Sequence, residues 1–107
     1  DSTTMTFPTT SATIARTDAA QTFTGNQTFT NVVTVSGGTA TPAAGSTSAR
    51  LLFGTTAGFG IYYGSGAPTV SAAQGSLYLR SDGSTTTSRT YVNTDGSTTW
   101  TAITTVA

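Results

Sequence analysis

The chain has 107 residues, of which only 7% are charged, and its four arginines and four aspartates give a net charge of zero. It contains no Cys, His, Glu or Lys, which excludes a disulfide framework and thiolate or imidazole ligands for a metal, and removes the usual general bases of nucleophilic catalysis. Four scattered arginines give no electrostatic footprint for a nucleic acid, and no apolar stretch approaches the roughly 20 residues of a membrane helix.

Threonine dominates the composition and makes up roughly a quarter of the residues, several times its ordinary usage. Because Thr is β-branched and favours pleated surfaces, the composition predicts an all-β fold. A chain of this size without disulfides buries little surface on its own, so we expect partner subunits to add stability. A weakly charged surface of Thr, Ser, Asn and Gly suits a protein whose surface is largely covered by neighbours, or one that functions outside the cell.

Residues 1–17 are predicted to form an N-terminal arm, followed by a β module over residues 18–107. Met5, Phe7 and Ile14 are the large apolar residues of the arm, and Pro8 interrupts any strand pairing there. A segment with so little apolar surface does not fold alone, so it either docks on another protein through these three residues or frays as a free terminus.

The first part of the module contains two phenylalanines and a valine-rich run. Phe23 and Phe29 are six residues apart, so they share one face if the strand is continuous, whereas Gly25-Asn26 would mark a turn between two short strands. Residues 31–35, "NVVTV", are predicted to be a strand. We expect a surface near the subunit contacts to include Phe23, Phe29, Val33 and Val35.

Residues 39–49 are predicted to be a loop, and two short apolar strands follow in "RLLFG" (50–54) and "FGIYYG" (59–64). Glycines within the second of these strands indicate a bulge or a close backbone approach.

The last third of the chain repeats itself, because "LYLRSDGST" (77–85) is followed by "TYVNTDGST" (90–98). An Asp-Gly pair flanked by alternating apolar residues is a strong hairpin signal, since Gly accepts a positive φ at little cost. We therefore predict a three-stranded meander over about 67–107, with turns at Asp82, Gly83, Asp95 and Gly96. Its packing residues are expected to be Leu77, Leu79 and Val92 on one face, Tyr78 and Tyr91 on the other, and Trp100 and Ile103 in the last strand.

Two readings give these residues a chemical role. Asp82 and Asp95 could act as the paired carboxylates of a glycosidase, but such an enzyme needs two carboxylates in different environments, and these are equivalent in a repeat. The tyrosines and Trp100 could form an exposed sugar-binding face. The alternative is that they pack in the core and between subunits. We predict no catalytic, cofactor-binding or metal-binding residues, no cofactor and no enzymatic activity.

Two segments resemble structural proteins of tailed bacteriophages. They are "TTSATIARTDAAQTFTGNQTFTNVVTVSG" and "GAPTVSAAQGSLYLRSDGSTTTSRTYVNTDGSTTWTAI", which together cover most of the chain. The second is similar to the C-terminal module of short virion proteins of the head-decoration and fibre type. The resemblance implies a β-rich, commonly trimeric and non-enzymatic virion component.

A short chain with an arm and one compact module suits a capsid decoration (cement) or head-fibre protein, which would bridge neighbouring copies of the major capsid protein on the capsid surface. The alternative is a tail-fibre or receptor-binding module that contacts host surface polysaccharide. The fold expected for either is a small antiparallel sandwich or barrel-like module with an extended arm, intertwined in a homotrimer, with no nucleic-acid or membrane partner.

Overall fold

The computed structural model describes residues 9, 18–35 and 42–107. The chain divides into two units, Asp1–Val32 and Val33–Ala107. The described residues 18–35 contain no helix and no strand, so the strand predicted over 31–35 is not formed. A β-prone run needs a neighbouring strand to pair with its backbone, and none of the described strands pairs with it.

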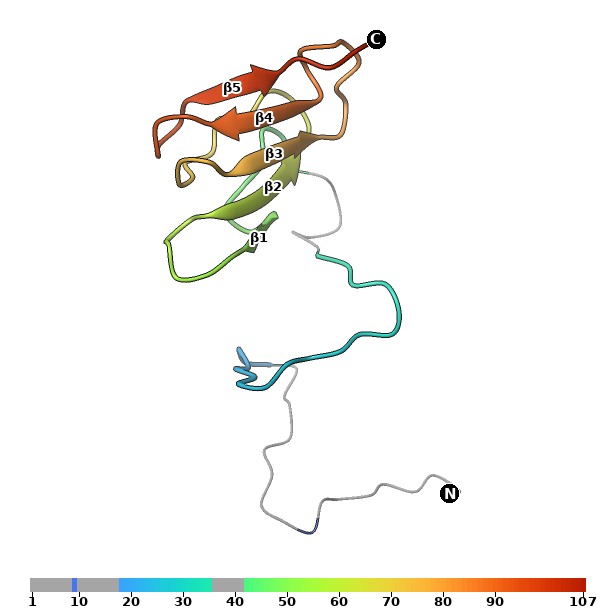
Figure 1. The fold of residues 1–107 in the computed structure, drawn as a ribbon, viewed down its shortest axis with the longest axis vertical. Coiled ribbons are helices and arrows are strands. Elements are labelled where there is room, and N and C mark those ends of the chain that lie inside the picture. The colour runs from blue at the N-terminus through green and yellow to red at the C-terminus, as the bar shows by residue number, and fades with distance from the viewer. Residues whose placement is uncertain (1–8, 10–17, 36–41) are drawn as a thin grey trace. The chain divides into compact units, whose positions relative to one another are not determined.

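Five strands make up the second unit, and they lie side by side in chain order in one open sheet (Figure 1). They are β1 (Arg50–Leu52), β2 (Gly60–Gly64), β3 (Leu77–Arg80), β4 (Thr90–Asn93) and β5 (Trp100–Ile103). The expectation of an all-β fold is confirmed. The described residues include no helix long and apolar enough to cross a membrane.

The sheet is mixed, because β2 and β3 run parallel while the other neighbours are antiparallel. The predicted antiparallel sandwich or barrel is therefore wrong for the described residues. Parallel neighbours need a crossover of about a dozen residues, and the connection over residues 65–76 supplies it without a helix. Loops thus replace the second sheet that a sandwich would need.

The last three strands form the predicted meander. Tyr78 of β3 lies opposite Tyr91 of β4, and Tyr91 lies opposite Ala102 of β5. Because side chains alternate along each strand, this register places all three residues on one face of the sheet. We call this the core face.

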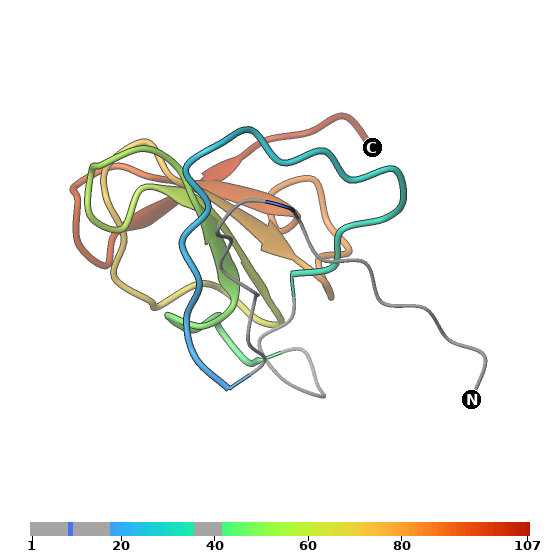
Figure 2. The same cartoon turned by 90° about the horizontal axis from the view of Figure 1, so that it is seen from below.

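The core face carries an aromatic core. Tyr62 and Tyr78 are fully buried, and the half-buried ring of Trp100 meets both edge-on at centroid distances of 5.8 Å. Edge-to-face pairs of this kind add to the free energy gained from burial. The loop before β1 and the loop between β2 and β3 cover the core face (Figure 2). They contribute Ala72, Val70 and the backbone around Gly45.

Gly64 shows why glycine is required inside β2. A Cβ atom added there would lie 2.5 Å from the hydroxyl oxygen of Tyr78 and 2.6 Å from the carbonyl oxygen of Pro42. The covering loop approaches the strand backbone so closely that no side chain fits, which confirms the close approach predicted from the glycines of this strand.

Candidate functional site

The other face of the sheet, which we call the outer face, is apolar and partly uncovered. Leu51 and Leu79 are each 48% exposed and Ile103 is 39% exposed, although all three are large apolar residues within strands. The strand register places them on one face with six neighbours, of which all but Thr101 are half-buried. The outer face consists of Leu51, Ile61, Tyr63, Leu77, Leu79, Thr90, Val92, Thr101 and Ile103.

No position of the outer face is charged. Arg50 and Arg80 alternate with outer-face residues and lie on the core-face side of their strands, opposite Tyr62 and Gly64. The aspartates of the described sheet unit, Asp82 and Asp95, lie in the connections between strands. The outer face is therefore a neutral surface of aliphatic, Tyr and Thr side chains.

A second apolar surface lies at the β1 edge of the sheet. Leu52 and Phe53 are 44% and 42% exposed, and the ring of Phe53 meets that of Phe59 at a centroid distance of 6.5 Å. Leu52 follows Leu51 directly, so the two leucines have similar exposure but point to opposite faces.

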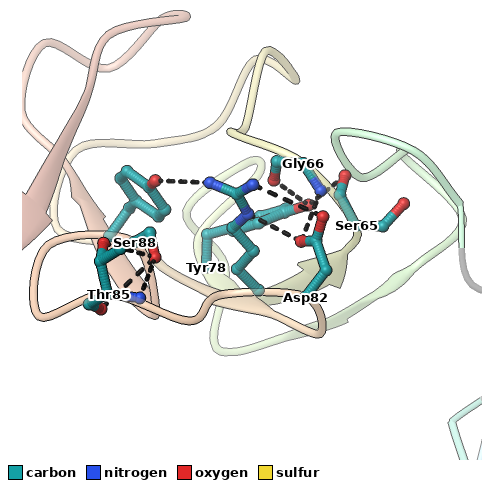
Figure 3. Close-up of polar contacts among 8 residues, drawn as sticks. Ser65, Gly66, Tyr78, Asp82, Thr85 and Ser88 are labelled. Atoms are coloured by element: carbon teal, nitrogen blue, oxygen red, sulfur yellow. Dashed lines mark hydrogen bonds and ion pairs between the residues drawn. The ribbon is translucent and has the colours of Figure 1, made fainter.

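The turn after β3 is held by an ionic network (Figure 3). Arg80 donates from Nε to Asp82 Oδ1 at 2.7 Å and from Nη1 to the Tyr91 hydroxyl at 3.3 Å. The backbone amide of Gly66 donates to the same Asp82 oxygen at 2.8 Å. The hydrogen bonds from Arg80 and Gly66 lower the pKa of Asp82 from 3.8 to about 2. Asp82 thus ties the β3–β4 connection to the loop that follows β2.

The turn after β4 is held by the side-chain amide of Asn93, where the turn after β3 is held by the guanidinium of Arg80. Asn93 is buried; its Oδ1 accepts a hydrogen bond from the Gly96 amide at 2.8 Å, and its Nδ2 donates to the Ser97 carbonyl at 2.8 Å. Hydrogen bonds from Thr99 and Ser97 hold the pKa of Asp95 below its usual value. Arg80 and Asn93 occupy the same position in the repeat, so each repeat fixes its turn with a different side chain.

The two Asp-Gly pairs therefore do not form the same turn. Gly96 has a φ of 73°, as expected of a turn glycine, whereas Gly83 does not have a positive φ. A Cβ atom at Gly83 would lie 2.8 Å from Arg89 Cα, so this glycine is required by a close approach within the β3–β4 connection. Both carboxylates are occupied by donors from nearby loops. Residues 9, 18–35 and 42–107 contain no group of three or more acidic, His or Cys residues that could hold a metal ion.

Three of the four tyrosines are buried in the core of the sheet unit. Tyr62, Tyr78 and Tyr91 belong to the core, and Trp100 donates from Nε1 to the Val70 carbonyl at 2.8 Å. Tyr63 is the tyrosine on the outer face. A flat aromatic platform for a sugar is therefore not presented by the three core tyrosines.

The remaining predicted site residues fall into three groups. Met5, Phe7 and Ile14 lie outside the described residues. The structure leaves four of the predicted packing residues exposed: Phe23, Phe29, Val33 and Val35. It brings Leu77, Leu79, Val92 and Ile103 together on the outer face. Leu51, Ile61 and Tyr63 also belong to this face, although the sequence does not reveal it. Alternation in "GIYYG" indicates that Ile61 and Tyr63 share a face, but it does not indicate which strands pair with this one.

Comparison with family models, curated proteins and solved structures finds no match for the chain.

Proposed function

We propose that this protein is a non-enzymatic structural component of a tailed-phage virion. Its role in this proposal is that of a capsid decoration (cement) or head-fibre protein on the capsid surface, which stabilises the capsid by bridging neighbouring capsid subunits. The observation that carries the proposal is the amount of large apolar surface left uncovered on a small sheet, at the outer face and at the β1 edge. Such surfaces mark sites of protein contact.

Covering these apolar surfaces stabilises an assembly because it removes them from water. Each Å² of apolar surface removed from water stabilises an assembly by roughly 25 cal/mol, and a specific interface buries about 1,600 Å² in total. Leu51, Leu52, Phe53, Leu79 and Ile103 supply apolar surface of this kind on two sides of the sheet. A subunit with two apolar surfaces can bind two neighbours at once, so copies that are linked to each other can each reach a different capsid subunit.

We further infer that the protein is a homotrimer and that the arm docks on the capsid. The arm residues Met5, Phe7 and Ile14 are the proposed docking groups, and this part of the proposal rests on the sequence. The intertwining of the subunits is a proposal of the same kind and rests on the exposed apolar side chains of residues 23–35.

The alternative, a tail-fibre or receptor-binding module for host polysaccharide, has less support. Glycan contacts through Tyr62, Tyr78 or Tyr91 would require these rings at the surface, and they lie in the core. The Asp-Gly loops would have to provide the contacts, but Asp82 already accepts hydrogen bonds from Arg80 and Gly66, and Asp95 accepts one from Ser97.

The test is to mix the purified full chain with capsids that lack it and to image the particles by electron microscopy. Regular density at three-fold or quasi-three-fold positions is the expected result. A chain without residues 1–17 and a full-length Met5→Ser, Phe7→Ser, Ile14→Ser variant are both expected to lose this density. Material found at the tail of intact virions, with none on the shell, would contradict the decoration role.

A further inference from the structure

We propose that the outer face is the surface along which copies of this chain associate, so that the occupant of the face is another copy of the same protein. This inference deepens the proposed function, because it names the surface that holds the proposed oligomer together, and it rests on that oligomer. The capsid contact is then made elsewhere, by the arm and the β1 edge.

Only the outer face of the sheet is available for a partner. The core face is filled by Tyr62, Tyr78, Tyr91 and the loops that cover them. The outer face also carries large apolar residues on all five strands, yet Leu51 and Leu79 remain about half exposed. A sheet with apolar side chains on both faces normally has both faces covered.

The absence of charge on the outer face favours a second copy as its partner. Where a surface packs against its own copies around a symmetry axis, a charge close to that axis faces the same charge on the other copies, and the two repel. The outer face avoids this cost because its arginine neighbours, Arg50 and Arg80, point to the other side of the sheet. Contacts with a foreign protein usually gain specificity from complementary charges, and the outer face offers none. Its neutrality therefore favours a second copy over a capsid subunit as the occupant.

The area of the outer face limits how strong the contact can be. Five strands about 4.8 Å apart and about four residues long present roughly 300 Å² in projection. A stable interface takes about 800 Å² from each partner, so the face can form the apolar centre of the contact but not all of it. We therefore expect association to depend on protein concentration and to be sensitive to a single charge at the centre of the face.

The chain offers a matched pair of leucines for the test. Leu51 and Leu52 are neighbours in β1 with exposed fractions of 48% and 44%, but only Leu51 belongs to the outer face. The experiment uses the full chain and measures mass by sedimentation or native mass spectrometry at concentrations up to about 100 µM, well above a micromolar dissociation constant. Leu51→Asp and Leu79→Asp are compared with Leu52→Asp and with the wild type.

The expected result is an oligomeric wild type, at least tenfold weaker association in Leu51→Asp and Leu79→Asp, and unchanged association in Leu52→Asp. Fluorescence of Trp100, the single tryptophan of the chain, reports whether each variant keeps its core. Should an Asp variant unfold, single cysteines replace it, because the chain has no cysteine of its own. A thiol at Thr101→Cys, on the outer face, is expected to be protected from labelling as concentration rises, whereas a thiol at Thr98→Cys, in the β4–β5 turn, is not.

A wild type that is monomeric at about 100 µM would overturn the inference and leave the face to another segment of the same chain or to the capsid. Equal weakening by Leu51→Asp and Leu52→Asp would also overturn it, because the edge of β1 rather than the face would then make the contact. Assembly through the face without any binding to capsids would keep the inference and remove the capsid role. A dimer formed through the face would keep the inference and remove the proposed trimer.

Discussion

Tyr78 and Tyr91 lie directly opposite each other on β3 and β4, with their rings edge-to-face and the ring centroids 6.2 Å apart. They are also the equivalent tyrosines of the repeated phrase, in "LYLRSDGST" and "TYVNTDGST". The repeat therefore has a structural purpose: it places two copies of the same aromatic residue in register across an antiparallel pair, at the centre of the core.

Replacement of Tyr78 by Ala is expected to cost about 3–5 kcal/mol of unfolding free energy, because it removes a fully buried ring that contacts both Tyr91 and Trp100. Tyr78→Phe keeps the ring and is expected to cost about 1 kcal/mol, since the hydroxyl makes only long hydrogen bonds of 3.4 and 3.5 Å. Urea unfolding followed by Trp100 fluorescence, at one fixed protein concentration, measures both values. Equal losses in the two variants would show that the ring packing is not what matters.

The glycine in β2 can be tested against one in open space. Gly64→Ala is expected to lower the free energy of unfolding by about 1–3 kcal/mol or more, because the new methyl group would meet Tyr78 and the backbone of Pro42. Gly25→Ala has no atom within 4 Å of the added Cβ and is expected to change stability by less than about 0.5 kcal/mol. Denaturant unfolding of both variants checks the difference, and a neutral Gly64→Ala would contradict the close approach of the covering loop.

Stability is expected to fall at acidic pH partly through Asp82. The pKa of this carboxyl is about 2 in the folded protein and its ordinary value is 3.8. The stabilisation from the ionised form is therefore complete above the ordinary pKa and is lost as the pH falls through about 2. Urea midpoints measured from pH 7 to pH 2 should decline less in Asp82→Asn than in the wild type.

Asp95 titrates in the same direction, because its pKa is also lowered. A double variant, Asp82→Asn with Asp95→Asn, is accordingly expected to have the flattest dependence on pH. A single Asp82→Asn variant that loses stability as steeply as the wild type between pH 4 and pH 2 would contradict the role of the Arg80–Asp82 pair.

Asn93 is expected to be essential for the second turn. Asn93→Ala removes the acceptor of the Gly96 amide and the donor to the Ser97 carbonyl. A loss of about 1–3 kcal/mol follows from leaving these groups without their partner. Thr94→Ala, an exposed neighbour, serves as the control and is expected to be close to neutral. Hydrogen exchange of the Gly96 amide gives a local readout, which should lose protection only in the Asn93 variant.

The strands could be predicted from the sequence because the local signals were strong. Alternation in "SLYLR" and "TYVN" and the Asp-Gly pairs gave the meander, and the apolar runs gave β1 and β2. The parallel pairing of β2 with β3 could not be predicted, because it depends on the path of the crossover over residues 65–76, which has no local pattern. The prediction of a sandwich failed for the same reason. Loops cover the core face in place of a second sheet, and no local sequence pattern indicates that loops do this.

The site was only partly predictable. Leu77, Leu79 and Val92 were assigned to one face because alternation fixes the face within a hairpin. Their continuation into Leu51 and Ile61 depends on pairing between strands far apart in the sequence, so periodicity alone could not reveal it. The strand predicted at 31–35 shows the opposite case, in which local propensity was present but the described residues provide no pairing strand.

The parallel pair has a further consequence for the order of folding. The antiparallel neighbours are joined by connections of six to nine residues, whereas β2 meets β3 through the twelve residues 65–76, the longest connection in the sheet. We expect the meander to form first and to leave the edge of β3 unpaired until the β1–β2 hairpin arrives. During that interval the β1–β2 hairpin of one molecule can pair with the free edge of β3 in another, so refolding at high protein concentration is expected to favour exchange of hairpins between molecules.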